Sequence, residues 1–287
     1  MPTATAATAV PLDVRPLSPT LGAEILGLDL RRPLDPATRD AVYAAFVRHH
    51  LLSFRDQDLS KREQVAFSEQ FGELEGHTLR NRGLNDEPFV HVVSNLDDEG
   101  RPIGKVRSDQ WHTDKSFRPR PSLATILHAR TLPPGGGGDT VFANMHAAYA
   151  DLDAADRAEL ERLRVVHSWE LSRENVGRVM SEEEKRDAPT NVWPLVRVHP
   201  DTGAKCLFVG CHASHLDGLP MADGRARIEA LEDHATSERF TYRHSWRKGD
   251  VLMWDNRCLL HRADANFDAG VHPRILHRTC LRGTAPA

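Results

Sequence analysis

Residues 240–254, FTYRHSWRKGDVLMW, contain two short apolar runs, 240–246 and 251–254, separated by four polar or glycine residues. Short runs of this kind, rich in aromatic and β-branched residues, are typical of strands. Similar runs recur along the chain at residues 51–54, 89–93, 123–129, 195–198, 207–209 and 275–281. Many short strands and few long helices favour a barrel or a double-sheet jelly roll over a doubly wound α/β fold.

Helices are predicted mainly in the N-terminal quarter. Asp35 followed by Pro36 is typical of an N-cap and the first helical position, and predicts a helix to about residue 49. Ser60 with Glu63 three residues later is a capping-box pattern for a second helix that ends near residue 72. We therefore predict an all-β core with helical elaborations, with a further strand at 21–30, turns at 133–138 and 199–203, and helical insertions at 154–164, 181–186 and 222–236.

Length and composition restrict the protein class. The chain has 287 residues and shows no internal repeat or linker, so we predict a flexible tail at 1–12 and one domain at 13–287. Lys and Arg total 37 against 41 for Asp and Glu, and this net charge of -4 argues against nucleic acid as a partner. No stretch approaches the ~20 apolar residues of a membrane span, and the first ten residues do not resemble a secretory signal. We therefore expect a cytoplasmic protein without a membrane partner.

The four cysteines, Cys206, Cys211, Cys258 and Cys280, show no C-x-x-C spacing. In a chain without an export signal, such cysteines are more often free buried thiols than disulfides or metal ligands. We expect free thiols.

Trp111-His112-Thr113-Asp114 places an imidazole and a carboxylate two residues apart. On an extended segment both side chains point to the same face, so they can bind one ion together. His261 follows the strand predicted at 251–254 and supplies a third ligand. Two histidines and one carboxylate leave the opposite coordination positions open, as in non-haem Fe(II) oxygenases.

His-x-Asp alone is a weak pattern, because a solvated surface pair gives the same tripeptide. The context strengthens it, since aromatic residues flank His112 and a Trp-containing strand precedes His261, so that apolar walls can exclude water. Other histidines lack such surroundings and are predicted to be structural or exposed: His49, His50, His128, His234 and His272.

Six segments together resemble the taurine dioxygenase and 2,4-dichlorophenoxyacetate dioxygenase family, the TauD/TfdA family of Fe(II)/2-oxoglutarate enzymes. They are LGAE (21–24), FGE (71–73), WHTD (111–114), GGDT (137–140), WDNR (254–257) with His261, and RILHR (274–278). The resemblance covers nearly the whole chain, and the segments at 191–199, 208–210 and 218–220 are most similar to the phenoxyacetate branch. It implies a double-stranded β-helix, or cupin-like jelly roll, with iron at its mouth.

The resemblance also implies a reaction. Fe(II), 2-oxoglutarate and O2 would hydroxylate a C–H bond of a small anionic substrate, with release of succinate and CO2. An aryloxyalkanoate is the favoured substrate, and hydroxylation beside its ether oxygen would yield a phenol and an aldehyde acid. Taurine, an alkylsulfonate or an alkyl sulfate is the alternative, and association into dimers or tetramers is expected.

Arginines near the C-terminus are assigned by the same resemblance. Arg274 matches the position that binds the distal carboxylate of 2-oxoglutarate, for which a guanidinium has the right two-pronged geometry, and Thr140 assists it. Arg278 matches the substrate-binding arginine, and an even separation keeps both arginines on one face of a strand. His77 matches a sulfonate-contacting position of the taurine enzyme, although its neighbours depart from that enzyme's sequence.

The segment before the iron motif also departs from the taurine enzyme, because Ser108 replaces an asparagine there, which argues against taurine itself. His212 and His215, in the sequence HASH, either line the substrate pocket or form a buried structural pair.

Two other classes remain open. A metal-dependent hydrolase or isomerase on the same barrel would also use His and Asp ligands, but it would need neither Arg274 nor O2. A metal-free binding protein for small acids would keep its ligand after chelation and show no turnover.

Overall fold

The structure, a computed structural model, describes residues 12–76, 87–174, 177–188 and 190–287. The predicted N-terminal tail therefore falls almost wholly outside the described residues. Strand content dominates, with β1 Asp13–Pro16, β2 Ala23–Leu26, β3 Leu51–Phe54, β4 His91–Ser94, β5 Ser122–Thr131, β6 Thr140–Asn144, β7 Arg164–His167, β8 Asn191–Pro194, β9 Val196–Val198, β10 Lys205–Leu207, β11 Ala213–Leu216, β12 Thr241–His244, β13 Val251–Asp255, β14 Leu259–Ala263 and β15 Ile275–Arg282. The helices are α1 Pro36–His49, α2 Lys61–Glu69, α3 Met145–Asp151, α4 Ala154–Leu160, α5 Trp169–Glu174, α6 Glu182–Asp187, α7 Met221–Ala235 and the 3-10 turn η1 Glu238–Phe240.

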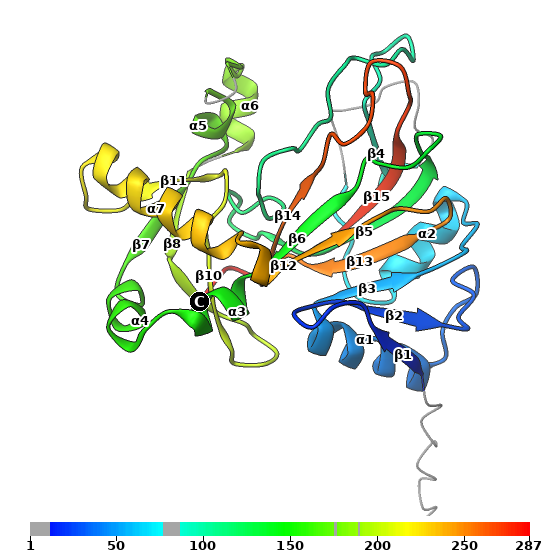
Figure 1. The fold of residues 1–287 in the computed structure, drawn as a ribbon, viewed down its shortest axis with the longest axis horizontal. Coiled ribbons are helices and arrows are strands. Elements are labelled where there is room, and N and C mark those ends of the chain that lie inside the picture. The colour runs from blue at the N-terminus through cyan, green and yellow to red at the C-terminus, as the bar shows by residue number, and fades with distance from the viewer. Residues whose placement is uncertain (1–11, 77–86, 175–176, 189) are drawn as a thin grey trace, which may run out of the picture.

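Two antiparallel sheets form the centre of the fold (Figure 1). The major sheet has the order β1-β2-β3-β13-β5-β15-β4, and only β2 and β3 pair in parallel. The small sheet has the order β12-β6-β14. The predicted all-β jelly roll with helical elaborations is confirmed. Division into a single domain at 13–287 stays a prediction.

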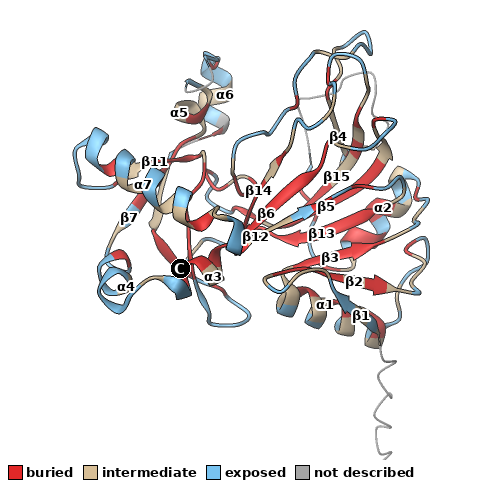
Figure 2. Ribbon diagram, in the orientation of Figure 1, coloured by how far each residue is buried: buried red, intermediate tan, exposed pale blue. Residues whose placement is uncertain are grey.

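Alternation along the central strands builds two hydrophobic cores. In β13, Leu252 and Trp254 face the core shared with the small sheet, whereas Val251 and Met253 face the core under α1 and α2. Successive side chains of a strand point to opposite faces, so a strand buried on both sides reads as an uninterrupted apolar run. Figure 2 shows these central strands as the most buried part of the molecule.

Local capping patterns predicted the first two helices well. Asp35 accepts hydrogen bonds from the backbone N–H groups of the first turn of α1, and Ser60 and Glu63 form a reciprocal capping box at α2. Such caps satisfy N–H groups that a helix leaves without partners.

Several predicted boundaries were wrong. The strand predicted at 21–30 is only Ala23–Leu26, because Gly27 follows with a positive φ of 77°. The helix predicted at 154–164 ends at Leu160, and Arg164 already begins β7. Strands β1, β6, β7, β8, β11 and β14 and helices α3 and α5 were missed. Among the described residues, no helix combines the length and apolar character of a membrane span.

Candidate functional site

Three side chains from two segments that are far apart in sequence meet at one point. His112 and Asp114 lie on the extended segment before β5, and His261 lies in β14. Two backbone hydrogen bonds of 3.0 and 2.8 Å join His112 and His261, which places their rings 4.1 Å apart. One ligand atom from each of the three residues lies within 4.8 Å of the others, and all three residues are buried.

Hydrogen bonds fix the orientation of these groups. The Nδ1–H of His112 donates to the carbonyl of Gln110 at 2.7 Å, since a carbonyl can only accept, and this leaves the Nε2 lone pair free. The hydroxyl of Thr125 donates to Asp114 Oδ2 at 2.5 Å. The backbone N–H of Asp114 donates to Asn256 Oδ1 at 3.3 Å, and Asn256 Nδ2 donates to Thr125 at 2.9 Å. Partners of this kind orient metal ligands.

The charges are those a cation needs. Burial alone would raise the pKa of Asp114, but Arg278, the two histidines and the Thr125 hydrogen bond outweigh it and hold that pKa well below its usual value. Burial lowers the pKa of both His112 and His261, so both rings are neutral at physiological pH. One carboxylate and two neutral imidazoles therefore face one point.

This donor set fits a ferrous ion. His261 Nε2 and Asp114 Oδ2 are 3.9 Å apart, too far for a hydrogen bond, and an ion can lie between them. Two histidines and one carboxylate on one face are the ligands of non-haem Fe(II) oxygenases.

A second charged group, the guanidinium of Arg274, contacts residues at the start of β6. Arg274 is 3% exposed, and its Nε–H donates to the carbonyl of Gly138 at 2.7 Å. Its Nη2 lies 3.5 Å from Thr140 Oγ1, which also accepts a 3.0 Å hydrogen bond from Trp246. Because Trp246 and Arg274 both donate to this oxygen, its proton is left to be donated to an anion. Burial lowers the pKa of Arg274 to about 10, so it keeps its charge.

Gly138 makes this arrangement possible. Its φ is +69°, and a Cβ built there would lie 2.7 Å from Arg274 Cδ and 2.9 Å from Nε. A side chain would therefore displace the guanidinium.

The substrate residues predicted from the sequence lie in different places. Arg278 projects toward the candidate iron ligands, and its Nη1–H donates to Asp114 Oδ1 at 3.1 Å. His212 packs edge to face against His112, with ring centroids 6.4 Å apart, and its Nδ1 lies 3.0 Å from Ser172 Oγ. His215 lies on β11 instead, where Ser214 and Gly224 of α7 are its neighbours. His77 falls outside the described residues, and all four substrate roles stay predictions.

The model of the family described as "Taurine catabolism dioxygenase TauD, TfdA family" matches residues 13–280. The chain belongs to this family. It is therefore an enzyme of the non-haem Fe(II), 2-oxoglutarate-dependent dioxygenase class.

Individual members are similar along their whole length. The alpha-ketoglutarate-dependent 2,4-dichlorophenoxyacetate dioxygenase of Burkholderia sp. (strain RASC) is 39% identical over 92% of this chain and 93% of its own. An alpha-ketoglutarate-dependent sulfate ester dioxygenase of Pseudomonas putida is 35% identical over 99% of this chain and 93% of its own. The crystal structure of AAD-2 with Mn(II) and N-oxalylglycine has a TM-score of 0.86 at 35% identity, and covers 96% of this chain and 98% of that one.

Sequence reasoning missed the residues that support Asp114 in this TauD/TfdA-family enzyme. Asn256 belongs to the WDNR motif and Thr125 to the strand predicted at 123–129, and neither pattern indicates a contact with Asp114. Arg257, in the same motif, is buried and structural, with Nε, Nη2 and its backbone N–H all donating to Asp255.

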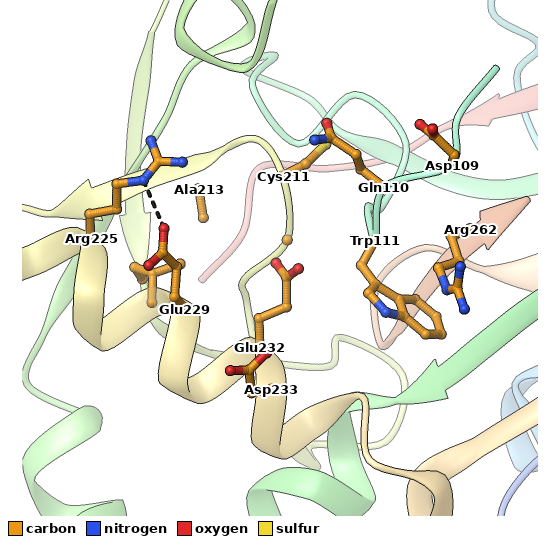
Figure 3. A pocket seen from close by; sticks show the side chains of 12 residues that line it. Asp109, Gln110, Trp111, Cys211, Ala213, Arg225, Glu229, Glu232, Asp233 and Arg262 are labelled. Atoms are coloured by element: carbon orange, nitrogen blue, oxygen red, sulfur yellow. Dashed lines mark hydrogen bonds and ion pairs between the residues drawn. The ribbon is translucent and has the colours of Figure 1, made fainter. Parts of the chain in front are cut away.

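A cavity of about 490 Å³ lies between the segment that carries Trp111 and helix α7 (Figure 3). Trp111 and Arg262, the sequence neighbours of His112 and His261, line it opposite the acidic face of α7. None of the three iron ligands lines this cavity, because neighbouring residues on extended segments point to opposite sides. Burial, with Asp233 and Glu229 nearby, raises the pKa of Glu232 in its wall to about 7.

Proposed function

We propose that this enzyme hydroxylates the carbon beside the ether oxygen of an aryloxyalkanoate carboxylate. His112, Asp114 and His261 hold the iron. Thr140 and Arg274 hold the distal carboxylate of 2-oxoglutarate, and Arg278 holds the carboxylate of the substrate. Bound iron, with 2-oxoglutarate and O2, supplies the oxidant for C–H hydroxylation and releases succinate and CO2.

The products follow from the chemistry of the hydroxylated carbon. It carries both a hydroxyl group and the ether oxygen, so it is a hemiacetal. The hemiacetal loses the aryloxy group as a phenol when the hydroxyl proton is transferred, and the remaining carbon becomes an aldehyde acid.

The position of Arg278 is the observation that best supports the substrate proposal. Its Nη1–H donates to Asp114, and its buried Nε has no hydrogen-bond partner among the described residues. Burial opposes the charge of Arg278, but Asp114, Cys280 and Glu75 outweigh burial and raise its pKa. A permanent, partly buried cation beside the candidate iron ligands, with a free donor, is suited to a substrate anion.

Aromatic side chains near the iron ligands suit the aryl ring. Phe117 and Trp169 are stacked with centroids 5.5 Å apart and planes inclined by 12°. Phe117 also meets His212 edge to face at 4.9 Å, and His212 in turn contacts the His112 ring. A flat ring can join this layer by stacking or edge contacts. The 39% identity to a 2,4-dichlorophenoxyacetate dioxygenase supports the same class, while the sulfate ester relative keeps the alkyl sulfates as the alternative.

The test starts without O2. Fe(II) and 2-oxoglutarate are added to the apoprotein, and the weak visible charge-transfer band of the chelated keto acid is recorded. Phenoxyacetate, an alkyl sulfate and taurine are then added in turn. We expect phenoxyacetate to shift the band and, on admission of air, to yield phenol and succinate in equal amounts.

Two variants give the test its controls. Arg278→Gln should lose the response to phenoxyacetate but keep the band, whereas Arg262→Gln, next to His261 in β14 but on the opposite face of that strand, should keep both. A shift with alkyl sulfate alone would replace the aryloxyalkanoate by that class. Absence of any band in folded, iron-loaded protein would refute the ligand assignment.

A further inference from the structure

A second group of metal-ligand side chains lies apart from the iron triad. His50 is the C-cap of α1, His146 is in the first turn of α3, and Cys258 is in the turn between β13 and β14. One ligand atom from each lies within 4.8 Å of the others. We propose that His50, His146 and Cys258 form a second metal site that takes Zn²⁺, with water as the fourth ligand.

The hydrogen bonding of the two histidines supports this site. Nδ1–H of His146 donates to the carbonyl of Lys205 at 2.8 Å, which leaves a lone pair on Nε2. That Nε2 is buried and has no hydrogen-bond partner among the described residues, and the same holds for Nδ1 of His50. A buried polar atom without a partner costs about 1–3 kcal/mol, so two on adjacent rings need an explanation. A shared cation satisfies both.

The backbone holds the three ligands in place. The N–H of Asp255 donates to the carbonyl of His50 at 2.9 Å, and the N–H of Met145 donates to the carbonyl of Cys258 at 3.0 Å. His50 itself is held in the left-handed region at φ 63° by the end of the helix. The rings of His50 and His146 are 5.1 Å apart. The site is thus preformed by elements of both sheets.

The neighbouring groups are already engaged and act around the ligands. Nε2–H of His199 donates to Asp255 at 3.0 Å, and its Nδ1 accepts the backbone N–H of Asp201 at 3.3 Å, so this ring has no lone pair to offer. Asp255 is also held by Arg257. Its negative charge favours a cation at the adjacent histidines, and it opposes the burial that lowers their pKa.

The chemistry of the donors selects the ion. Two neutral imidazoles and one thiolate are ligands for Zn²⁺ or another borderline transition ion, not for Mg²⁺ or Ca²⁺. Burial lowers the pKa of His50 to about 4, so its lone pair is available at neutral pH. Burial and Asp255 raise the pKa of Cys258, so the thiol is protonated in the free protein and releases that proton to water when the ion binds.

Cobalt distinguishes this site from the iron site. Co²⁺ bound to a thiolate gives a near-ultraviolet charge-transfer band, and His112, Asp114 and His261 include no sulfur. We expect Co²⁺ titration of the His112→Ala apoprotein, in which the iron site lacks a ligand, to produce this band, saturating at one equivalent, and Zn²⁺ to remove it. Elemental analysis of zinc-loaded His112→Ala protein should find one ion per chain.

Matched variants decide which cysteine is responsible. Cys258→Ser should abolish the band, and His146→Gln should abolish or shift it. Cys280→Ser, equally buried but beside Thr125 at the iron site, should keep it. A band that survives Cys258→Ser, or that disappears in Cys280→Ser, would overturn the proposal. Folded protein that binds no Zn²⁺ beyond the iron site would also overturn the proposal. If Cys258→Ser fails to fold, His146→Gln still tests the site, because it keeps every cysteine.

Discussion

Replacing Gly138 by alanine should weaken 2-oxoglutarate binding without touching any group that contacts the co-substrate. Gly138 has φ +69°, and a Cβ there would lie 2.7 Å from Arg274 Cδ and 2.9 Å from Nε. Ordinary contacts begin near 3.4 Å, so the arginine must move by several tenths of an ångström. This movement breaks the 2.7 Å hydrogen bond from Nε to the Gly138 carbonyl, which orients the guanidinium.

The size of the effect can be worked out in two parts. A left-handed alanine costs about 1–2 kcal/mol of folding stability. Loss of a hydrogen bond to a charged group costs about 1.5–3 kcal/mol. If the second part appears in co-substrate binding, 2-oxoglutarate affinity falls about 10- to 150-fold.

Gly136 provides the matched control. Its φ is +92°, but a Cβ there meets nothing within 4 Å. Gly136→Ala should therefore show the backbone cost, as a lower midpoint of urea unfolding, with unchanged 2-oxoglutarate affinity. Affinity is read from anaerobic titration of the visible charge-transfer band. Equal affinity in Gly138→Ala and Gly136→Ala would refute the positioning of Arg274 by Gly138.

Three further predictions concern groups around the two sites. Asn256→Ala removes the acceptor for the Asp114 N–H and should weaken Fe(II) binding about 10- to 100-fold in competition with a chelator, and unchanged affinity would contradict a supporting role. Burial lowers the pKa of His167 to about 3, so the unfolded state binds more protons below pH 6.5 and stability falls as the pH falls. Between pH 8 and pH 5 this histidine should account for about 2 kcal/mol of lost unfolding free energy, which His167→Gln should abolish in denaturant titrations at the two pH values. Arg257→Met leaves the buried Asp255 carboxylate without its cation and should cost about 3–5 kcal/mol, against less than about 1 kcal/mol for Arg239→Met at the exposed pair with Asp151.

Local sequence patterns were sufficient to predict the elements that local interactions stabilise. Asp35 and Ser60 begin helices because their side chains accept N–H groups two or three residues away, and that information lies within one turn. Strand 51–54 was predicted with its observed bounds because all four residues are buried in the centre of the major sheet.

Strands whose polar residues serve the site could not be predicted in this way. In β14, the sequence LLHRA shows no alternation, because His261 faces the iron site and Arg262 lies over the Trp111 ring. The strand exists because it pairs with β6 along its whole length. Pairing between segments more than a hundred residues apart is not visible in a single sequence.

That His112, Asp114 and His261 hold iron stays a prediction. The closeness of His112 and Asp114 was predicted because a two-residue spacing on an extended segment is a local property. The contact of Arg278 with Asp114 was not, because it depends on where β15 lies relative to the segment before β5. The sequence also predicted free cysteines and a structural His50, since spacing alone gave no reason to join Cys258 to histidines at positions 50 and 146.

The turn between β13 and β14 contributes to both sites. It connects the major sheet to the small sheet, so it sets the position of His261 relative to the segment that carries Asp114. Asn256 in this turn supports Asp114, while its neighbours Asp255 and Cys258 face the second cluster. Asn256 and Arg257 in this turn are buried polar residues, and hydrogen bonds and the Asp255–Arg257 pair hold them, to which a bound ion would add. Zn²⁺ at the second cluster would therefore stabilise the turn that positions His261 relative to Asp114.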